Sequence, residues 1–248
     1  MKNIFALTAA LAVVTAGSPA LAQVVIGGSG GNSSANAAQQ PTGYLSTETA
    51  SVLRDGLAYI SAGSPVGNIL AGSTVNYRRG MGRGGELAVG VGLNLGLNPG
   101  GFGGGVGAGW KQSLMSGGAM SMALDGGLSL TNLGTTNTLG ATVGLPLSFG
   151  PNLTVNPRVS LPALTAGTAG GNLAVGLGYQ MPLMPMWQLL AEVTPTVGFG
   201  GGVTVPVGVG GRFSPTATSH IDVTVGNVGL NPFGGNIGLV GLTGHIGF

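Results

Sequence analysis

The chain has 248 residues, of which only 6% are charged, and its formal net charge is +2. Soluble domains carry roughly 25% charged residues. This composition therefore excludes an ordinary soluble globule with a charged coat. The small net charge gives no indication of a nucleic-acid partner. The chain has no cysteine, so disulfides and thiolate metal sites are also excluded.

The apolar residues are distributed in short runs. Mean hydropathy is +0.45, yet the chain has 52 glycines and 14 prolines, and glycine or proline interrupts every apolar run after residue 22. No such run reaches the roughly 20 residues that a spanning helix needs. Segments of about ten residues suit membrane-spanning strands instead.

The N-terminus has the three parts of a secretory signal peptide. Lys2 provides the positive charge, Phe5 to Ala16 form the apolar stretch, and Ala20-Leu21-Ala22 form a small-x-small cleavage site. Residues 1–22 are therefore predicted to direct Sec-dependent export. An N-terminal anchor helix is the alternative, which the short apolar stretch disfavours.

Residues 23–55 follow the predicted cleavage site. Within them, residues 27–43 consist largely of Gly, Ser, Asn, Ala and Gln, a composition typical of flexible segments. We expect residues 23–55 to be a flexible periplasmic leader that carries no folded element.

From residue 56 onward, apolar residues recur at every second position, which is the period of a strand with one apolar face. In residues 86–97 one face carries Leu87, Val89, Val91, Leu93, Leu95 and Leu97, and the other carries Glu86, Ala88, Gly90, Gly92, Asn94 and Gly96. The pattern predicts strands at 56–63, 70–78, 86–97, 103–114, 119–130, 138–149, 152–161, 171–181, 186–197, 203–213, 217–226 and 238–248.

The predicted fold is all-β: a closed antiparallel transmembrane β-barrel over residues 56–248, with about twelve strands. Ten strands are possible, because the first two are weakly patterned. Four prolines (Pro146, Pro157, Pro195 and Pro206) fall inside predicted strands, where a missing N–H calls for local bulges.

Charged residues indicate which face looks inward. Eight of them lie opposite most of the large aliphatic residues of their strands. A Lys or Arg facing lipid at mid-membrane costs roughly 2–4 kcal/mol, so the charged face is predicted to line the lumen. The predicted lumen residues are Arg78, Glu86, Lys111, Asp125, Arg158, Glu192, Arg212 and Asp222.

Links between the predicted strands alternate between tight and longer, as periplasmic turns and outer loops do in such barrels. The seven-residue link between residues 78 and 86 breaks this alternation. Aromatic side chains gather near the periplasmic ends, where they are predicted to form an interfacial girdle of Tyr77, Trp110, Phe149, Tyr179, Trp187 and Phe213.

The chain ends in Val240-Gly-Leu242-Thr-Gly-His-Ile246-Gly-Phe248, with apolar residues at alternate positions before a terminal aromatic. This segment resembles the C-terminal sorting signal of bacterial outer-membrane barrels. The resemblance implies recognition of Val240, Leu242, Ile246 and Phe248 by the barrel-assembly machinery, and a place in the outer membrane.

The favoured function is a narrow pore or transporter for small solutes, with the lipid bilayer as partner and an unknown solute. The alternatives are a non-conducting structural or adhesive barrel and an exported Gly-rich coat protein without a barrel. No enzyme, cofactor or metal site is predicted: His220 and His245 form no ligand cluster, and Ser214 or Ser219 beside His220 has no distinctive spacing.

Overall fold

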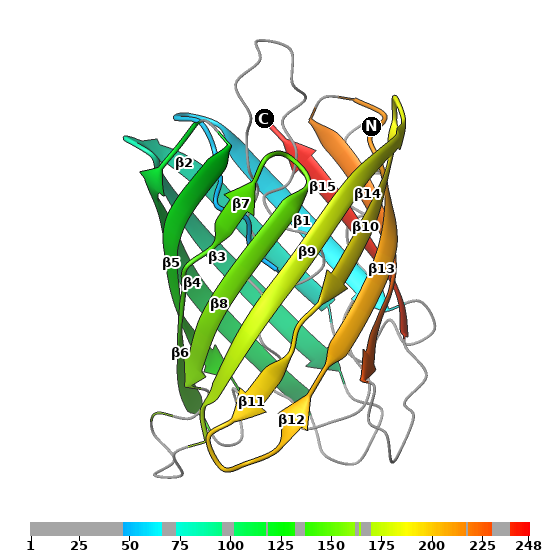
Figure 1. The fold of residues 1–248 in the computed structure, drawn as a ribbon. Helices are drawn as coiled ribbons and strands as arrows, with labels where there is room; N and C mark the ends of the chain where they lie inside the picture. The colour runs from blue at the N-terminus through cyan, green and yellow to red at the C-terminus, as the bar shows by residue number, and fades with distance from the viewer. Residues whose placement is uncertain are drawn as a thin grey trace.

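The computed structural model describes residues 47–65, 73–95, 102–117, 119–131, 137–161, 164, 170–216, 218–229 and 239–248. Its elements are β1 (Ala58–Pro65), β2 (Ser73–Gly82), β3 (Gly85–Leu95), β4 (Phe102–Met115), β5 (Met120–Thr131), β6 (Thr138–Gly144), β7 (Leu147–Phe149), β8 (Leu153–Leu161), β9 (Asn172–Met184), β10 (Trp187–Val193), β11 (Thr196–Gly198), β12 (Val203–Thr204), β13 (Pro206–Phe213), β14 (Ser219–Gly229) and β15 (Leu239–Gly247). Figure 1 shows these strands wrapped into a single wall. In the described residues no helix is long and apolar enough to cross a membrane.

The wall is closed, because the last strand pairs with the first. β15 lies antiparallel to β1, with Tyr59 opposite Gly247 and Pro65 opposite Gly241, and every other neighbouring pair is antiparallel too. Phe248 extends this pairing at the seam, which is where β15 meets β1. Its backbone N–H donates to the carbonyl of Ala58 at 3.0 Å, and its carbonyl accepts from the N–H of Ala58 at 2.9 Å. The predicted closed barrel of twelve strands is confirmed, and the hypothesis of a coat protein without a barrel is wrong.

Three of the twelve barrel strands are broken at prolines. β6 and β7 are separated at Pro146, β10 and β11 at Pro195, and β12 and β13 just before Pro206. A proline has no N–H to donate to its neighbour, so the ladder stops there. The carbonyls of Pro146 and Pro195 still accept from Ala123 and Val175, which keeps the wall continuous. Pro157 stays within β8, as predicted.

One end of the barrel carries only tight turns. The links there are two to five residues long, against four to ten at the other end, as expected for periplasmic turns and outer loops. The predicted seven-residue link between residues 78 and 86 is wrong, because β2 and β3 continue to Gly82 and Gly85. Arg83 and Gly84, with φ of 52° and 72°, form the two-residue turn. Positive φ at both central residues matches the twist of a tight hairpin.

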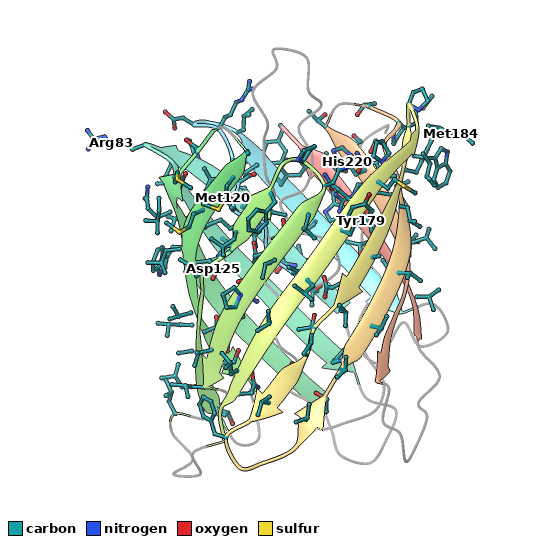
Figure 2. The ribbon with its side chains drawn as sticks, viewed as in Figure 1. Arg83, Met120, Asp125, Tyr179, Met184 and His220 are labelled. Atoms are coloured by element: carbon teal, nitrogen blue, oxygen red, sulfur yellow. The ribbon has the colours of Figure 1, made fainter. Side chains whose placement is uncertain are left out.

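The outer surface of the barrel is apolar (Figure 2). Leu87, Val89 and Val91 on β3 are about half exposed, whereas the residues that alternate with them, Glu86, Ala88 and Gly90, are buried. The same alternation exposes Leu128 on β5 and Val143 on β6. Exposed aliphatic side chains around a closed barrel are the surface that a lipid bilayer covers.

The predicted girdle residues lie on this outer surface or partly buried in it. Trp110, Phe149, Tyr179 and Trp187 are 41–44% exposed. Tyr77 and Phe213 are intermediate in burial. Trp187 and Phe213 are cross-strand partners whose rings lie 4.9 Å apart. Their role at the membrane interface stays a prediction.

That role can be tested with the two tryptophans of the chain, Trp110 and Trp187. In vesicles of brominated lipid, we expect bromines near the headgroups to quench the fluorescence more than bromines near the bilayer centre. The reason is that indole rings prefer the interface. Trp110→Phe and Trp187→Phe report on each ring separately. Stronger quenching from the bilayer centre would contradict the girdle.

Candidate functional site: a charged belt crossed by an inner segment

Five of the eight predicted lumen residues form a row on the inner wall, here called the charged belt. Strand register places Glu86 opposite Lys111, Lys111 opposite Asp125, Asp125 opposite Gly144, and Gly144 opposite Arg158. Arg78 joins the row from β2. Positive and negative side chains therefore alternate from strand to strand. The members of the charged belt are Arg78, Glu86, Lys111, Asp125 and Arg158.

Ion pairs link the members of the belt to one another. Arg78 donates through Nη1 to Oε1 of Glu86, and Arg158 donates through Nη2 to Oδ2 of Asp125 at 2.7 Å. The side chains of Arg78, Glu86 and Lys111 are at most 7% exposed, and that of Arg158 is 15% exposed. Buried charges on this scale are tolerated only when they are paired and hydrogen-bonded.

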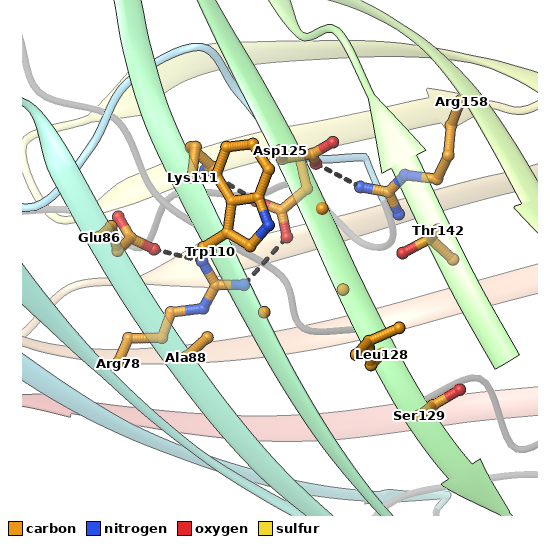
Figure 3. A pocket seen from close by; sticks show the side chains of 14 residues that line it. Arg78, Glu86, Ala88, Trp110, Lys111, Asp125, Leu128, Ser129, Thr142 and Arg158 are labelled. Atoms are coloured by element: carbon orange, nitrogen blue, oxygen red, sulfur yellow. Dashed lines mark hydrogen bonds and ion pairs between the residues drawn. The ribbon is translucent and has the colours of Figure 1, made fainter. Parts of the chain in front are cut away.

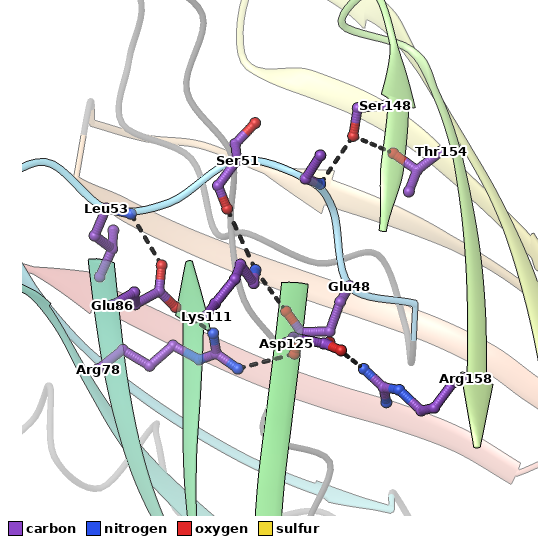
Figure 4. A network of polar contacts seen from close by, with 11 residues as sticks. Glu48, Ser51, Leu53, Arg78, Glu86, Lys111, Asp125, Ser148, Thr154 and Arg158 are labelled. Carbon is purple, nitrogen blue, oxygen red and sulfur yellow. Dashed lines mark hydrogen bonds and ion pairs between the residues drawn. The ribbon is translucent and has the colours of Figure 1, made fainter. Parts of the chain in front are cut away.

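A stretch of chain before β1 lies inside the barrel, and we call Thr47–Leu53 the inner segment (Figure 4). Its Glu48 is 1% exposed and bonds to two cations of the belt. Arg78 Nη2 lies 2.9 Å from Oε1 of Glu48, and Lys111 Nζ lies 2.7 Å from Oε2. Lys111 also donates to the carbonyl of Ser51 at 3.3 Å.

Backbone N–H groups hold the inner segment at three further points. Thr47 donates to Oε2 of Glu192 at 2.7 Å, and Leu53 donates to Oε2 of Glu86 at 2.9 Å. Between them, Ala50 donates to the hydroxyl of Ser148 at 3.0 Å. Hydrogen bonds to a carboxylate are stronger than those between neutral groups. The inner segment is thus fixed at both ends and in the middle.

The two carboxylates that hold its ends lie on opposite sides of the barrel. Glu86 is on β3, and Glu192 is on β10, six barrel strands further round a wall of twelve. The six residue steps from Thr47 to Leu53 reach roughly 20 Å when extended. The inner segment therefore runs across the lumen from wall to wall.

Two wall glycines leave room for this stretch of chain. A Cβ at Gly176 would clash with Oγ1 of Thr47, and a Cβ at Gly80 would clash with the carbonyl oxygen of Arg54. Any residue other than glycine would clash with the inner chain at these two positions unless the wall or that chain moved. The wall is shaped to receive the chain between Thr47 and Arg54.

The predicted flexible leader is wrong over residues 47–55, because this part is bonded to the barrel interior. Residues 1–46, with the predicted signal peptide and the rest of the leader, lie outside the described residues. Sequence reasoning also missed Glu48 as a site residue. The available signal was that Glu48 is the first charged residue after Lys2.

Glu48 precedes β1 and belongs to none of the spanning strands. Burial raises the pKa of its carboxyl, but the nearby Arg78 and Lys111 outweigh burial and hold that pKa below its ordinary value. Opposite charges within hydrogen-bond distance favour the ionised form of a carboxyl. Glu48 therefore contributes a full negative charge to the lumen.

A cavity of about 560 Å³, which includes space open to solvent, lies against the charged belt (Figure 3). Its polar lining comes from Glu48 and all five belt residues, with Ser129 and Thr142 further along the wall. Gly109 and Gly127 line it as well and add no side chain. The cavity offers charges of both signs to whatever enters it.

Of the remaining predicted lumen residues, Glu192 on β10 holds the inner segment at Thr47. The other two, Arg212 and Asp222, belong to a second cluster on β13, β14, β15 and β1. Arg212 donates to both oxygens of Asp222 at 2.7 Å, and Nε2 of His245 lies 3.2 Å from Oδ2 of Asp222. Arg212 is 0% exposed and Asp222 is 3% exposed. This second cluster ties the last strands of the barrel together at the seam.

The structure brings Ser214 to His220, with 2.8 Å between the hydroxyl and Nδ1. The other ring nitrogen lies 3.3 Å from the hydroxyl of Tyr59. In a hydrolase triad a carboxylate orients the histidine at that point. Ser214, His220 and Tyr59 thus form a chain of hydrogen bonds, with a tyrosine hydroxyl at the place where a triad has its carboxylate. Within the described ranges, no three His, Cys, Asp or Glu side chains could hold a metal ion together.

No protein-family model and no curated protein sequence matches the chain. Among solved structures it is similar to the NanC porin, with a TM-score of 0.53 and 8% identity over 77% of this chain and 98% of that one. It is also similar to the KdgM porin, with a TM-score of 0.50 and 11% identity over the same shares. At this identity the likeness is one of fold.

The fold is that of a bacterial outer-membrane β-barrel. A closed antiparallel wall leaves no unpaired strand edge, and its apolar outer face suits hydrocarbon. The protein therefore resides in the outer membrane, with the belt and the inner segment enclosed by its wall.

Proposed function

We propose that the barrel is a narrow pore for small polar solutes. The observation that carries this proposal is the charged belt, which places charged side chains of both signs beside a cavity inside a twelve-stranded wall. Eight strands enclose an interior that side chains can fill, whereas sixteen or more leave an aqueous channel. Twelve strands with a glycine-rich inner face leave space for solutes that are small.

A non-conducting structural barrel is the second candidate. The inner segment favours it, since a chain crossing the lumen from β3 to β10 reduces the open cross-section. The two candidates differ in one measurable property, which is whether ions cross the folded protein.

Conductance in planar lipid bilayers tests the proposal. Purified protein that resists SDS until boiled should give discrete current steps in KCl, because water and ions fill the space beside the belt. Steps that are absent at every voltage, from protein shown to be folded by its heat-dependent gel mobility, would favour the structural barrel.

We further propose the route by which the chain reaches the membrane. Residues 1–22 are removed after Sec-dependent export, and the barrel-assembly machinery recognises Val240, Leu242, Ile246 and Phe248. Support for the second step comes from the end of β15, the closing strand, where the next residue, Phe248, is 62% exposed. The pore uses no cofactor and performs no catalysis in this proposal.

A further inference from the structure

We infer that the inner segment is the constriction of the lumen and that Glu48 determines its ion selectivity. This inference rests on the proposed pore and assigns the selectivity of that pore to one residue. It follows from where the segment lies, from the charges of the wall beside it, and from the way Glu48 is held.

The inner segment lies in the path of any solute. It is bonded to Glu192 on one side of the barrel and to Glu86 on the other, so among the described residues it narrows the lumen at this level to the space beside it. The cavity against the belt has Glu48 among its lining residues. An ion that passes the belt therefore passes the Glu48 carboxylate.

The belt alone carries an excess of positive charge. Its three cations are Arg78, Lys111 and Arg158, and its two anions are Glu86 and Asp125. Glu48 supplies the third anion, and it does so by bonding to both Arg78 and Lys111. Glu192, which holds Thr47 from the far side of the wall, is a fourth anion at this level. The wall and the inner segment together therefore carry one net negative charge, and without Glu48 the same level would be neutral.

A single uncompensated charge has a measurable effect in so narrow a space. Acting on an ion about 4 Å away through water, it changes the local concentration of that ion about fivefold. Low-dielectric walls strengthen the effect, because they focus the field along the lumen. Glu48 is therefore placed to make the pore favour cations.

The experiment measures reversal potentials in a KCl gradient across planar bilayers for the full-length exported protein. The wild type should reverse at a potential that indicates a preference for K⁺ over Cl⁻. Glu48→Gln keeps the size of the side chain and removes its charge, so we expect the Cl⁻ to K⁺ permeability ratio to rise about fivefold or more. Lys111→Gln should shift the ratio in the opposite direction, toward K⁺.

A double variant that compensates the change in charge provides the decisive test. The double variant Glu48→Gln with Lys111→Gln removes one charge of each sign and so restores the net charge that the wild type has at this level, and its reversal potential should return to that of the wild type. Asp55→Asn is the matched control, because Asp55 is exposed and lies outside the belt and the inner segment. It removes the same charge from the chain and should leave the reversal potential unchanged.

The outcomes separate this inference from the proposed pore. If channels form but Glu48→Gln reverses where the wild type and Asp55→Asn do, the inference is wrong and the pore stands. If Glu48→Gln fails to fold, the shift of Lys111→Gln decides in its place, and an unshifted potential overturns the inference. Absence of channels from the folded wild type and all variants would overturn the pore itself.

Discussion

Replacing Asp222 by Ala is expected to lower the free energy of unfolding by about 3–5 kcal/mol, because it leaves the guanidinium of Arg212 buried without its carboxylate. Arg212 is 0% exposed, and its Nε and Nη2 both donate to Asp222 at 2.7 Å. The same change removes the partner of His245 Nε2. Urea unfolding in lipid vesicles, followed by the fluorescence of Trp110 and Trp187, measures the effect.

Two further variants show whether the lost ion pair is the cause. Asp55→Ala removes an exposed carboxylate and should change the free energy of unfolding by less than about 0.5 kcal/mol. Arg212→Met together with Asp222→Ala removes both charges, and should recover most of the loss, since no unpaired charge remains. A double variant as unstable as Asp222→Ala would show that the pair is not what stabilises the seam.

Placing an arginine at Val89 is expected to cost about 2–4 kcal/mol in the same assay, because the middle of β3 faces the centre of the bilayer. Val89 is 51% exposed and its strand neighbours Ala88 and Gly90 are buried. The exposed side chain therefore meets lipid rather than water. Val89→Leu, which stays apolar, should be close to neutral.

The position of Met81 provides the control for depth. Met81 is 54% exposed and lies two residues before the turn at Arg83. An arginine there should cost only about 0–1 kcal/mol, since the penalty falls toward the interface. Equal stability of Val89→Arg and Met81→Arg would mean that the outer face of β3 does not contact the hydrocarbon.

The sequence by itself determined which way each strand faces. Leu87, Val89 and Val91 are outside and Glu86 is inside, because lipid and lumen impose opposite demands on neighbouring residues of one strand. This rule acts residue by residue, so twelve strands could be counted without knowing any contact. Prolines limited the accuracy of the predicted strand bounds. Pro146 and Pro195 each interrupt a strand that the alternation of apolar residues predicts to be continuous.

Only the tertiary structure decided what the charged residues do. Eight lumen residues were predicted, but their division into a belt on β2 to β8, a cluster at the seam, and Glu192 bonded to the inner segment depends on register and closure. Ser214 meets His220 for the same reason. No local pattern specifies which side chains meet across a ring of paired strands.

The inner segment is the clearest example of a feature that only the tertiary structure decided. Residues 47–53 have no alternation that predicts a strand, and their composition continues the polar leader. Glu48 lies 30 residues from Arg78, and Thr47 lies 145 residues from Glu192. Those partners come within reach only when twelve strands close and enclose the chain that precedes them. The alternation along each strand is a local response to lipid and water, whereas the crossing of the lumen follows from long-range closure of the wall.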